Sequence, residues 1–577
     1  VEKMRTIQLM HSAFNMNNKK LGRDVMAFAE LHNALAAEQF GSRKNHQAVL
    51  AALNKRLTMD LLRQLRQAGA LCSNDAKSCY DRIVHNIAAL ALRRLGLPPA
   101  PIASMFKTLQ KASHHVSTAF GISARTYGGA RNPALQGVGQ GNGAGPAIWA
   151  VISTVIIAVM ATQGHGFNLL SALTSTLISF VCYAFVDDTD LVHSARTTEN
   201  SGEDVIAEMQ EVLDRWGGVL RATGGALVPS KSYWYVIDFI WTGSKWAYRS
   251  MTDMPGDISI TGVDGQRVVL TRHDPDVGLE TLGVMQAMDG NNREEVRHLR
   301  KKADEFADSM RTGYLSKNDA WCALTATIMK TLEYPMAAIT LTEQNWEHIM
   351  VPILKAGLPR SGIDRSFPRD MLHGPTSLQG MGRLHPWCHQ EITHLLVCLQ
   401  QTTIRGTTGQ LIAASTEQLR LELGLPGWLT DHDYEVFGAL TTASWITTVW
   451  RFTSRFKIEI RDSEAKLEER RTNDQFLMLA FAKAGFRGPE LNKLNICRNF
   501  LHSVTLSDIS TVNGQSISLA AWHGTRDASC GTEYSWPREQ VKLPNDYWDL
   551  WRKALRLSFL NRGSSRLLRE RMGRWNR

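Results

Sequence analysis

Apolar residues along the chain follow two different periods, and the change from one to the other separates predicted strands from predicted helices. An apolar run rich in aromatic and β-branched residues starts at Phe180, is interrupted by Asp187 and Asp188, and resumes up to His193. This pattern predicts two buried strands joined in a hairpin, with both carboxylates at the turn. A shorter apolar stretch predicts a strand that ends at Asp75 and leads into a helix.

Helical spacing of apolar residues predicts the longer elements. It indicates helices over about 47–67 and 203–220, a helical stretch over about 292–339, and a mostly helical remainder up to Arg577. An aromatic strand is predicted at 233–235. The fold class that follows is α+β, with strands concentrated in the first half of the chain.

Three shorter predictions concern the N-terminal half and the middle of the chain. The residues from Arg5 to Met10 are expected to form a short strand headed by a cation. The segment from Gln39 to Lys44 is expected to be a turn whose cations grip phosphate or remain ordinary surface charge. The glycines at 262 and 265 predict a hairpin.

A glycine-rich loop, residues 137–145, opens onto a long apolar segment at 147–161. Glycines allow a close approach of backbone to a ligand, but the loop lacks the Gly-Lys-Ser/Thr ending of a phosphate-binding P-loop. The apolar segment is too short for a comfortable membrane span, so we expect a buried helix and no membrane partner.

Composition adds a preference for a polyanionic partner. The 577 residues carry 65 Lys and Arg against 55 Asp and Glu, a net charge of +10, and the isoelectric point is about 9.2. The basic residues cluster in the tail 552–577, which predicts either nucleic-acid binding or a solvated helix face. The eight cysteines are scattered, which favours reduced thiols in an intracellular protein. His385, Cys388, His389, His394 and Cys398 fit an amphipathic helix better than a zinc site.

The adjacent carboxylates are the first candidate for chemistry. Asp187 and Asp188 repel each other, and a bound divalent cation such as Mg²⁺ would remove that penalty. If the strand ending at Asp75 is a neighbour, its carboxylate can join them and hold two metal ions about 4 Å apart for phosphoryl transfer. Taken singly, the Asp pair is equally well an acidic turn, and Asp75 a helix cap.

The order of several motifs resembles that of reverse transcriptases of the non-LTR (LINE-type) retrotransposon family. The resemblance is good from residue 1 to about 385 and poor beyond it. Valine at 186 and glycine at 145 depart from the common alanine and serine. The matching stretches are Arg5-Thr-Ile, Gln39-Phe-Gly-Ser-Arg43, Asp75-Ala-Lys-Ser-Cys-Tyr80-Asp81-Arg-Ile, Gln140-Gly141-Asn-Gly-Ala-Gly145-Pro146, Phe185-Val-Asp187-Asp188, Lys231, Leu282-Gly283-Val, and His373-Gly-Pro with Gly380-Met-Gly382.

This resemblance implies a right-hand polymerase with a palm built on an antiparallel sheet. The implied domains are partial fingers (1–69), a palm with intervening fingers elements (70–290), a thumb (291–385) and a helical C-terminal region with a basic tail (386–577). The implied catalytic residues are Asp75, Asp187, Asp188 and Lys231, the first three binding two Mg²⁺ ions, with Mn²⁺ as a substitute. The implied nucleotide-binding residues are Arg5, Tyr80, Gln140 and Gly141.

The implied partners are an RNA template, a DNA primer and deoxynucleoside triphosphates. A full element would also need an endonuclease, upstream or separate, and the implied location is nuclear. A further fingers lysine is expected before Arg5, so the sequence is interpreted as part of a longer product. Two alternatives remain open: another templated polymerase such as an intron maturase, and a decayed polymerase fold that binds RNA or acts as a scaffold.

Overall fold

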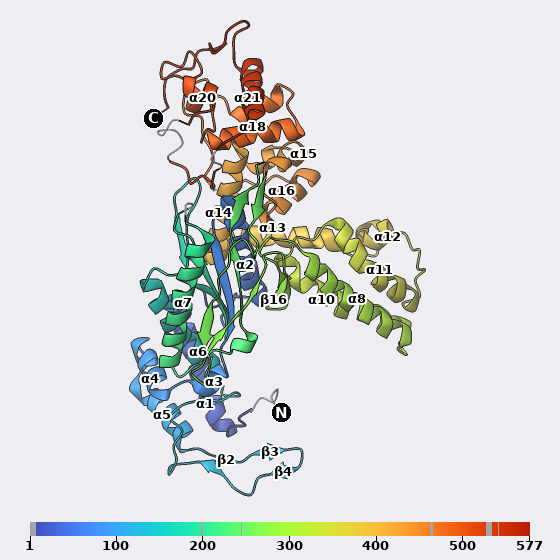
Figure 1. The fold of residues 1–577 in the computed structure, drawn as a ribbon. Helices are drawn as coiled ribbons and strands as arrows, with labels where there is room; N and C mark the ends of the chain where they lie inside the picture. The colour runs from blue at the N-terminus through green and yellow to red at the C-terminus, as the bar shows by residue number, and fades with distance from the viewer. Residues whose placement is uncertain are drawn as a thin grey trace.

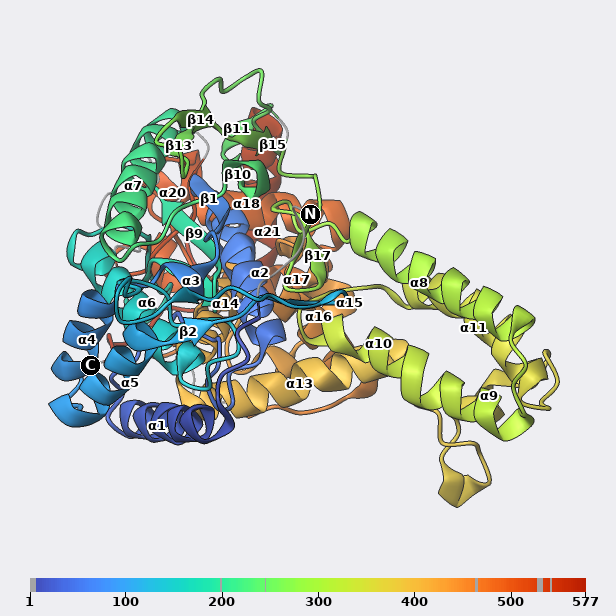
Figure 2. The same ribbon diagram turned by 90° about the horizontal axis from the view of Figure 1, so that it is seen from below.

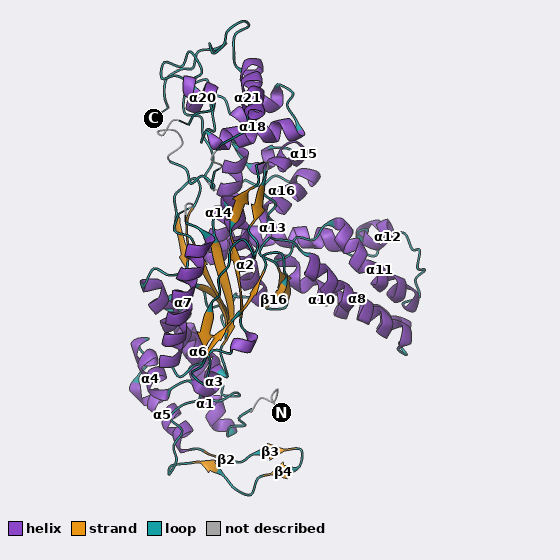
Figure 3. Cartoon of the chain, in the orientation of Figure 1, coloured by secondary structure: helices purple, strands orange, loops and turns teal. Residues whose placement is uncertain are grey.

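The chain is organised around one five-stranded sheet, seen in the middle of the computed structural model (Figures 1 and 3). The structure describes residues 7–197, 200–243, 245–461, 465–526, 533–539 and 542–576. The strand order in the sheet is β15-β10-β1-β9-β8. Its strands are β1 (Gly69–Asp75), β8 (Cys182–Phe185), β9 (Asp188–Ser194), β10 (Tyr233–Ile237) and β15 (Thr271–His273).

All neighbouring strands in this sheet run antiparallel except β10 and β15, which are parallel. β1 lies in the centre and pairs with β9 along its whole length, so that Asp75 stands opposite Asp188. β8 and β9 form the predicted hairpin, with Val186 and Asp187 in its turn. The predicted antiparallel sheet is therefore present in β8, β9, β1 and β10, while its assignment to a palm stays a prediction.

Both faces of the sheet are covered, so β1, β8, β9 and β10 are buried at most of their positions. On one face Leu71 and Val192 belong to the same core as helix α2 (Ala48–Leu65). On the other face Cys72 and Trp234 belong to a second core, which contains α6 and α7. The helices of the N-terminal half are α1 (Ser12–Leu31), α3 (Cys79–Arg82), α4 (His85–Arg94), α5 (Pro99–Lys111), α6 (Gly145–Thr162) and α7 (Gly202–Ala222).

The helices predicted over 47–67 and 203–220 are confirmed as α2 and α7. The apolar segment 147–161 is inside α6, which is long and apolar enough to cross a membrane by length and composition. However, 61% of its apolar window is buried within the protein, against α1, α4 and α7. The burial fits the predicted core helix.

The strand predicted from Arg5 to Met10 is wrong for its described part. Residues 1–6, including Arg5, lie outside the described residues, and no strand is assigned from Ile7 to Met10. The backbone N–H of Gln8 instead donates to the carbonyl of Gln140, at 2.7 Å. Residues 7–10 therefore lie beside the glycine-rich loop and not beside a strand. The loop does not provide the regular series of backbone hydrogen bonds that a strand would need.

Short hairpins extend the sheet region. The glycines at 262 and 265 do form a hairpin, between β13 and β14, as predicted. β16 and β17 form a further hairpin, which has Leu282 and Gly283 in its turn. The short strands are β2 (Ser113–His114), β3 (Ser117–Thr118), β4 (Gly121–Ile122), β5 (Tyr127–Gly128), β6 (Phe167–Leu170), β7 (Leu177–Phe180), β11 (Phe239–Trp241), β12 (Trp246–Tyr248), β13 (Ser259–Thr261), β14 (Arg267–Val269), β16 (Leu279–Thr281) and β17 (Val284–Gln286).

A helical lobe projects to one side of the body in both views (Figures 1 and 2). It matches the helical pattern predicted over about 292–339 and continues beyond it. Its two longest helices, α8 and α11, pack against each other. The helices of the lobe are α8 (Arg293–Thr312), α9 (Lys317–Ala323), α10 (Met329–Glu333), α11 (Glu343–Arg360) and α12 (Arg369–His373).

The C-terminal region is mostly helical, as predicted. Its helix α14 packs on α2, so α2 is covered on the side that faces away from the sheet. The His and Cys residues from His385 to Cys398 lie at the start of α13 and along it, as an ordinary helix. The helices are α13 (Pro386–Ile404), α14 (Thr407–Leu423), α15 (Tyr434–Phe437), α16 (Trp445–Phe456), α17 (Leu477–Lys483), α18 (Gly488–Phe500), α19 (Leu506–Ile509), α20 (Leu519–His523) and α21 (Asn545–Ser558).

The basic tail is not one helix face, because α21 ends at Ser558. Three of its arginines donate hydrogen bonds to backbone carbonyls of the same region: Arg566 to Ile517, Arg569 to Leu560 and Arg571 to Asn513. These arginines therefore help to hold the C-terminal region together. Nucleic-acid binding by the tail stays a prediction.

Candidate active site

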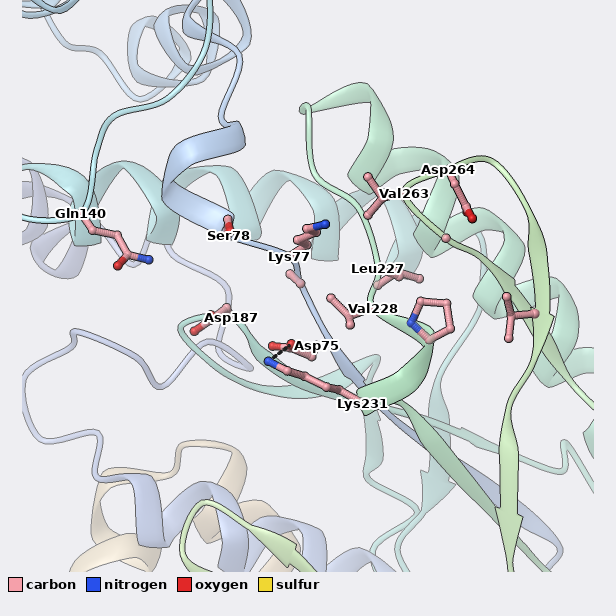
Figure 4. A pocket seen from close by; sticks show the side chains of 14 residues that line it. Asp75, Lys77, Ser78, Gln140, Asp187, Leu227, Val228, Lys231, Val263 and Asp264 are labelled. Carbon is pink, nitrogen blue, oxygen red and sulfur yellow. Dashed lines mark hydrogen bonds and ion pairs between the residues drawn. The ribbon is translucent and has the colours of Figure 1, made fainter. Parts of the chain in front are cut away.

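A cavity of about 920 Å³ opens at the end of β1, beside the β8–β9 turn (Figure 4). Asp75, Asp187 and Lys231 all line it, together with Gln140. The residues around them are Ala76, Lys77, Ser78, Leu227, Val228, Pro229, Gly262, Val263, Asp264 and Val268. The structure thus brings together four residues that come from four separate stretches of sequence.

Asp75 reaches the cavity because β1 is the central strand and ends there. The segment that follows α7 runs alongside this end: Lys77 N–H donates to the Ala226 carbonyl at 2.8 Å, and Val228 N–H to the Asp75 carbonyl at 3.0 Å. A short 3₁₀ turn, Pro229–Lys231, then carries Lys231 over the strand. Lys231 Nζ lies 2.7 Å from Asp75 Oδ2, the ion pair drawn in Figure 4. The lysine side chain is 64% exposed and the aspartate 20%, so the pair is open to a ligand.

Asp188 does not line this cavity. It borders a second one of about 450 Å³, which is also lined by Asp190 and by Leu282 and Gly283 of the β16–β17 hairpin. Asp187 belongs to the turn, whereas Asp188 is the first residue of β9 and stands opposite Asp75. Burial, which removes water from the carboxylate, raises the pKa of Asp188 to about 6, and the charges of Asp187 and Asp75 contribute to this rise.

Within the described residues, no group of three or more His, Cys, Asp or Glu side chains is gathered closely enough to hold a metal ion. Asp75 and Asp187 nevertheless share one cavity and offer the hard oxygen ligands that Mg²⁺ prefers. Burial is the main cause of the raised pKa of Asp188, and the charges of Asp187 and Asp75 add a smaller repulsion that a cation would relieve. The donor set therefore fits a divalent ion held by Asp75 and Asp187, while a metal contact for Asp188 stays a prediction.

The turn that carries Asp187 is held by a buried glutamine that the sequence analysis did not single out. Val186 has φ of +58°, which a β-branched residue rarely adopts. Gln39, fully buried, accepts from Val186 N–H at 3.0 Å and donates to its carbonyl at 3.3 Å, and Trp149 Nε1 donates to the same carbonyl. A Cβ at Gly41 would overlap the Val186 backbone. Gln39, Gly41 and Trp149 thus fix the position of Asp187.

Gln39 belongs to the turn whose cations were expected either to grip phosphate or to be ordinary surface charge. The Arg43 guanidinium is instead bonded to Glu30 by two hydrogen bonds, at 2.8 and 2.9 Å, and to the carbonyl of Ala36. Its side chain is 9% exposed. Arg43 therefore holds the segment that supports Gln39, and the phosphate interpretation of Arg43 is wrong in this structure.

The predicted nucleotide-binding residues are only partly brought together. Gln140 lines the cavity, whereas Tyr80 and Gly141 are not among its lining residues. Tyr80 is half-buried and lies against Gly145 at the start of α6, within the core on that face of the sheet. Gly141 has φ of +109°, and a Cβ there would overlap the carbonyl of Gln8, so only glycine fits. Arg5 lies outside the described residues.

A buried ion pair ties the sheet to the neighbouring hairpin. Lys55 of α2 lies 2.8 Å from Asp190 of β9 and 2.7 Å from the Thr281 hydroxyl of β16. Burial alone would lower the pKa of Lys55, but the Asp190 carboxylate raises it above its usual value. Lys55 therefore stays charged and joins three elements around the second cavity, a role that its place within a helical pattern does not reveal.

Comparison with known proteins adds the family of this region. Residues 1–235 match the family model described as reverse transcriptase (RNA-dependent DNA polymerase). This part of the chain is a reverse transcriptase domain. A domain of this kind is an RNA-directed DNA polymerase. Asp75, Gln140, Asp187 and Lys231 all lie within the reverse transcriptase domain, which ends inside β10.

The search of curated proteins gave no match. Among solved structures, telomerase of Candida tropicalis in complex with a telomeric RNA fragment is 12% identical, with 75% of this chain and 56% of that chain covered and a TM-score of 0.31. Telomerase of Candida albicans with such a fragment is also 12% identical, with 71% and 55% covered and a TM-score of 0.30. The chain thus spans little more than half the length of these structures, and likenesses of this size carry no argument.

Proposed function

We propose that this chain is the reverse transcriptase of a non-LTR retrotransposon, which copies RNA into DNA by adding deoxynucleotides to a primer 3′-hydroxyl. The observation that carries the proposal is the cavity at the end of β1, where Asp75, Asp187 and Lys231 converge with Gln140. The order of the sequence motifs supports the retrotransposon assignment. On this proposal the sheet is the palm and the helical lobe from α8 to α12 is the thumb.

The residues of the cavity divide the work of nucleotidyl transfer. Asp75 and Asp187 would hold Mg²⁺, which when bound supplies charge neutralisation at the attacking and leaving oxygens. Gln140 lines the same cavity and would shape the pocket for the templating pair. Lys231, now paired with Asp75, carries a proton close to where the pyrophosphate would leave.

The partners follow from the same chemistry. They are an RNA template, a DNA primer and deoxynucleoside triphosphates, with a second metal ion and Mn²⁺ substitution as further parts of the proposal. Insertion into a genome would need an endonuclease, upstream or on a separate chain, and would take place in the nucleus.

Primer extension with purified variants tests the proposed function. Asp75→Ala and Asp187→Ala should abolish nucleotide addition on an RNA template with Mg²⁺, because each removes a carboxylate from the shared cavity. Asp264→Ala is the matched control, since this exposed carboxylate lines the same cavity from the β13–β14 hairpin. Near wild-type extension by either Asp75→Ala or Asp187→Ala would refute the two-carboxylate site.

A second measurement addresses the retrotransposon assignment. The enzyme should extend the 3′ end of a nicked DNA duplex on an RNA template, as insertion at a chromosomal target requires. An enzyme that extends only primers already annealed to RNA would remain a reverse transcriptase but lose this assignment.

A further inference from the structure

A long part of the chain contains no acidic residue at all. Across the whole chain 55 of the 577 residues are Asp or Glu, yet none occurs between Asp81 and Asp187. The cations of this stretch are Arg82, Arg93, Arg94, Lys107, Lys111, Arg125 and Arg131. Such a stretch is suited to lie against a polyanion, because it contains no carboxylate that would repel phosphate.

The middle of this stretch forms a projecting arm, residues 113–128. The arm consists of two small antiparallel ladders in succession, β2 with β5 and β3 with β4. In Figures 1 and 2 it extends away from the body on the side to which the lobe from α8 to α12 also projects. Almost all of its residues are exposed. A connection between two elements of the core can be shorter than this arm, so its length is a feature to be explained.

The arm displays flat rings to solvent. Phe120, at the tip, is 101% exposed and has no core to enter. Tyr127 is 49% exposed, and its ring stacks on His114 across the strands, with centroids 5.3 Å apart. Rings exposed in these positions are accessible to a partner. Unpaired bases are such partners, because a base of any type can stack on an exposed ring.

The tip is held in shape by its own polar groups. Ser123 exchanges bonds with Val116, donating through its N–H at 2.8 Å and accepting through its hydroxyl at 2.9 Å. The hydroxyl of Thr118 accepts from the N–H of Phe120 at 3.1 Å, and the Ser123 hydroxyl donates to the Arg125 carbonyl at 2.8 Å. The ring of Phe120 is therefore presented on a turn that is already formed, which lowers the entropy lost on binding.

The arm is connected directly to the candidate active site. Its second strand runs on to Gln136, which pairs with Val84 just after α3. His85 Nε2 then bonds to the Gly137 carbonyl at 2.8 Å, and the glycine-rich loop leads to Gln140 in the cavity. The segment that follows the arm therefore leads to the wall of the cavity at Gln140.

We propose that the arm binds the unpaired RNA template ahead of the active site, with Phe120 stacking on a base and Arg125 contacting phosphate. The proposal rests on the proposed function for the identity of the strand as a template. Single-stranded RNA fits better than a duplex, since only unpaired bases offer free faces for stacking. The absence of acidic residues favours RNA over an apolar protein surface as the partner.

Binding measurements on the full chain test the proposal without requiring synthesis. Phe120→Ser should weaken the affinity for labelled single-stranded RNA by about tenfold, from the loss of one stacked base. Arg125→Ser should reduce the salt slope by about 0.7, the value for one phosphate contact on a single strand. The controls are Val512→Ser and Lys483→Ser, which change an exposed apolar residue and an exposed cation of the C-terminal region. Melting temperatures should be unchanged for all four variants.

Template length separates the arm from the active site. Extension of a primer on a template with a long 5′ overhang should weaken in Phe120→Ser, while a template that ends one nucleotide past the primer should be used as by wild type. Equal use of both templates by the variant, with unchanged RNA affinity, would overturn the proposal. Unchanged RNA affinity with altered sedimentation would do the same and make the arm a protein contact. If RNA affinity falls but no variant or wild type extends primers, the arm proposal stands and the proposed function fails.

Discussion

At the residue scale, an ion pair in the candidate active site joins the proposed proton donor to a proposed metal ligand. Lys231 Nζ and Asp75 Oδ2 are 2.7 Å apart. Because both side chains remain accessible, the pair need not persist when substrate and metal enter. On the proposed mechanism, the lysine would then be released near the departing pyrophosphate. Lys231 would thus have two separable roles, one before binding and one during reaction.

Replacing Lys231 with leucine separates these roles. Lys231→Leu should slow the chemical step about 10²–10⁴-fold, the usual contribution of a positioned proton donor. Template–primer affinity should hold. Single-turnover rates and equilibrium binding measure the two effects. Lys77→Leu, at another lysine of the same cavity, controls for loss of positive charge. If the single-turnover rate of Lys231→Leu equals that of wild type, Lys231 is not a proton donor, and its role is limited to its ion pair with Asp75.

Tyr80 is the residue whose predicted role depends most on substrate. It lies against Gly145 rather than on the cavity wall, and burial raises the pKa of its hydroxyl. If its ring excludes a ribose 2′-hydroxyl, Tyr80→Ala should admit ribonucleotides with little loss of deoxynucleotide use. If it is a core aromatic, the variant should lose about 3–5 kcal/mol of stability. Incorporation of both sugar types and the melting temperature, measured on one preparation, distinguish the two.

At the scale of single elements, Glu295 links the helical lobe to the hairpin beside the second cavity. It is fully buried on α8, and its carboxylate accepts from Met285 N–H of β17 at 2.7 Å. Burial raises the pKa of Glu295 to about 7. The folded protein therefore holds a proton that the unfolded chain releases near pH 4.5, and stability must fall as pH rises between these values.

Thermal melting between pH 4 and 8 tests this linkage. The loss of stability over that range should reach about 3 kcal/mol from Glu295 alone, at about 1.4 kcal/mol per pKa unit. Glu295→Gln should remove this component and leave the protein more stable at pH 8. Glu305→Gln, on the exposed side of the same helix, should not. A pH profile that Glu295→Gln does not alter would show that the carboxyl ionises freely.

Elements whose apolar residues follow one period were predictable from sequence, and contacts between distant elements were not. The β8–β9 hairpin, α2, α7 and the strand ending at Asp75 each reveal themselves through a local pattern. Gln39 lies far from Val186 in sequence, and a lone glutamine in a turn carries no local signal for its contact with that peptide. Asp188 was grouped with Asp187 because they are adjacent, although Asp187 lies in the turn and Asp188 begins β9, where it borders the second cavity.

At the scale of the whole molecule, the C-terminal region is packed against the sheet domain through α2. Every residue of α2 except Ala48 is buried, between the sheet and α14. Asp60 of α2 accepts from the backbone N–H of Trp445 at 2.6 Å, and Arg63 donates to the Ala443 carbonyl at 2.8 Å. Domain boundaries drawn from sequence stay predictions, but residues 386–577 bury surface that the sheet domain cannot cover alone.

Removing that region should therefore destabilise the reverse transcriptase domain. A chain of residues 1–385 should lose its cooperative melting transition and bind a hydrophobic dye, because α2 becomes exposed on one side. Trp445→Ala should cost about 3–5 kcal/mol in the full chain, since the ring is fully buried. Trp575→Ala, at a half-exposed ring, should cost less. A shortened chain that melts as cooperatively as the full one would show that the two regions fold independently.

The clamp on Val186 also constrains how this sequence can change over generations. Gln39, Gly41 and Val186 depend on one another. The Gln39 side-chain amide bonds to the Val186 peptide, and the missing side chain of Gly41 leaves room for the Val186 backbone. A descendant that loses Gln39 inherits a valine in a rarely adopted backbone conformation that has lost both Gln39 hydrogen bonds and retains the one from Trp149. Its simplest repair is glycine at 186, which adopts that conformation without strain. Substitutions at these three positions should therefore occur together. Ancestors of this enzyme should differ from it at two or three of these positions or at none.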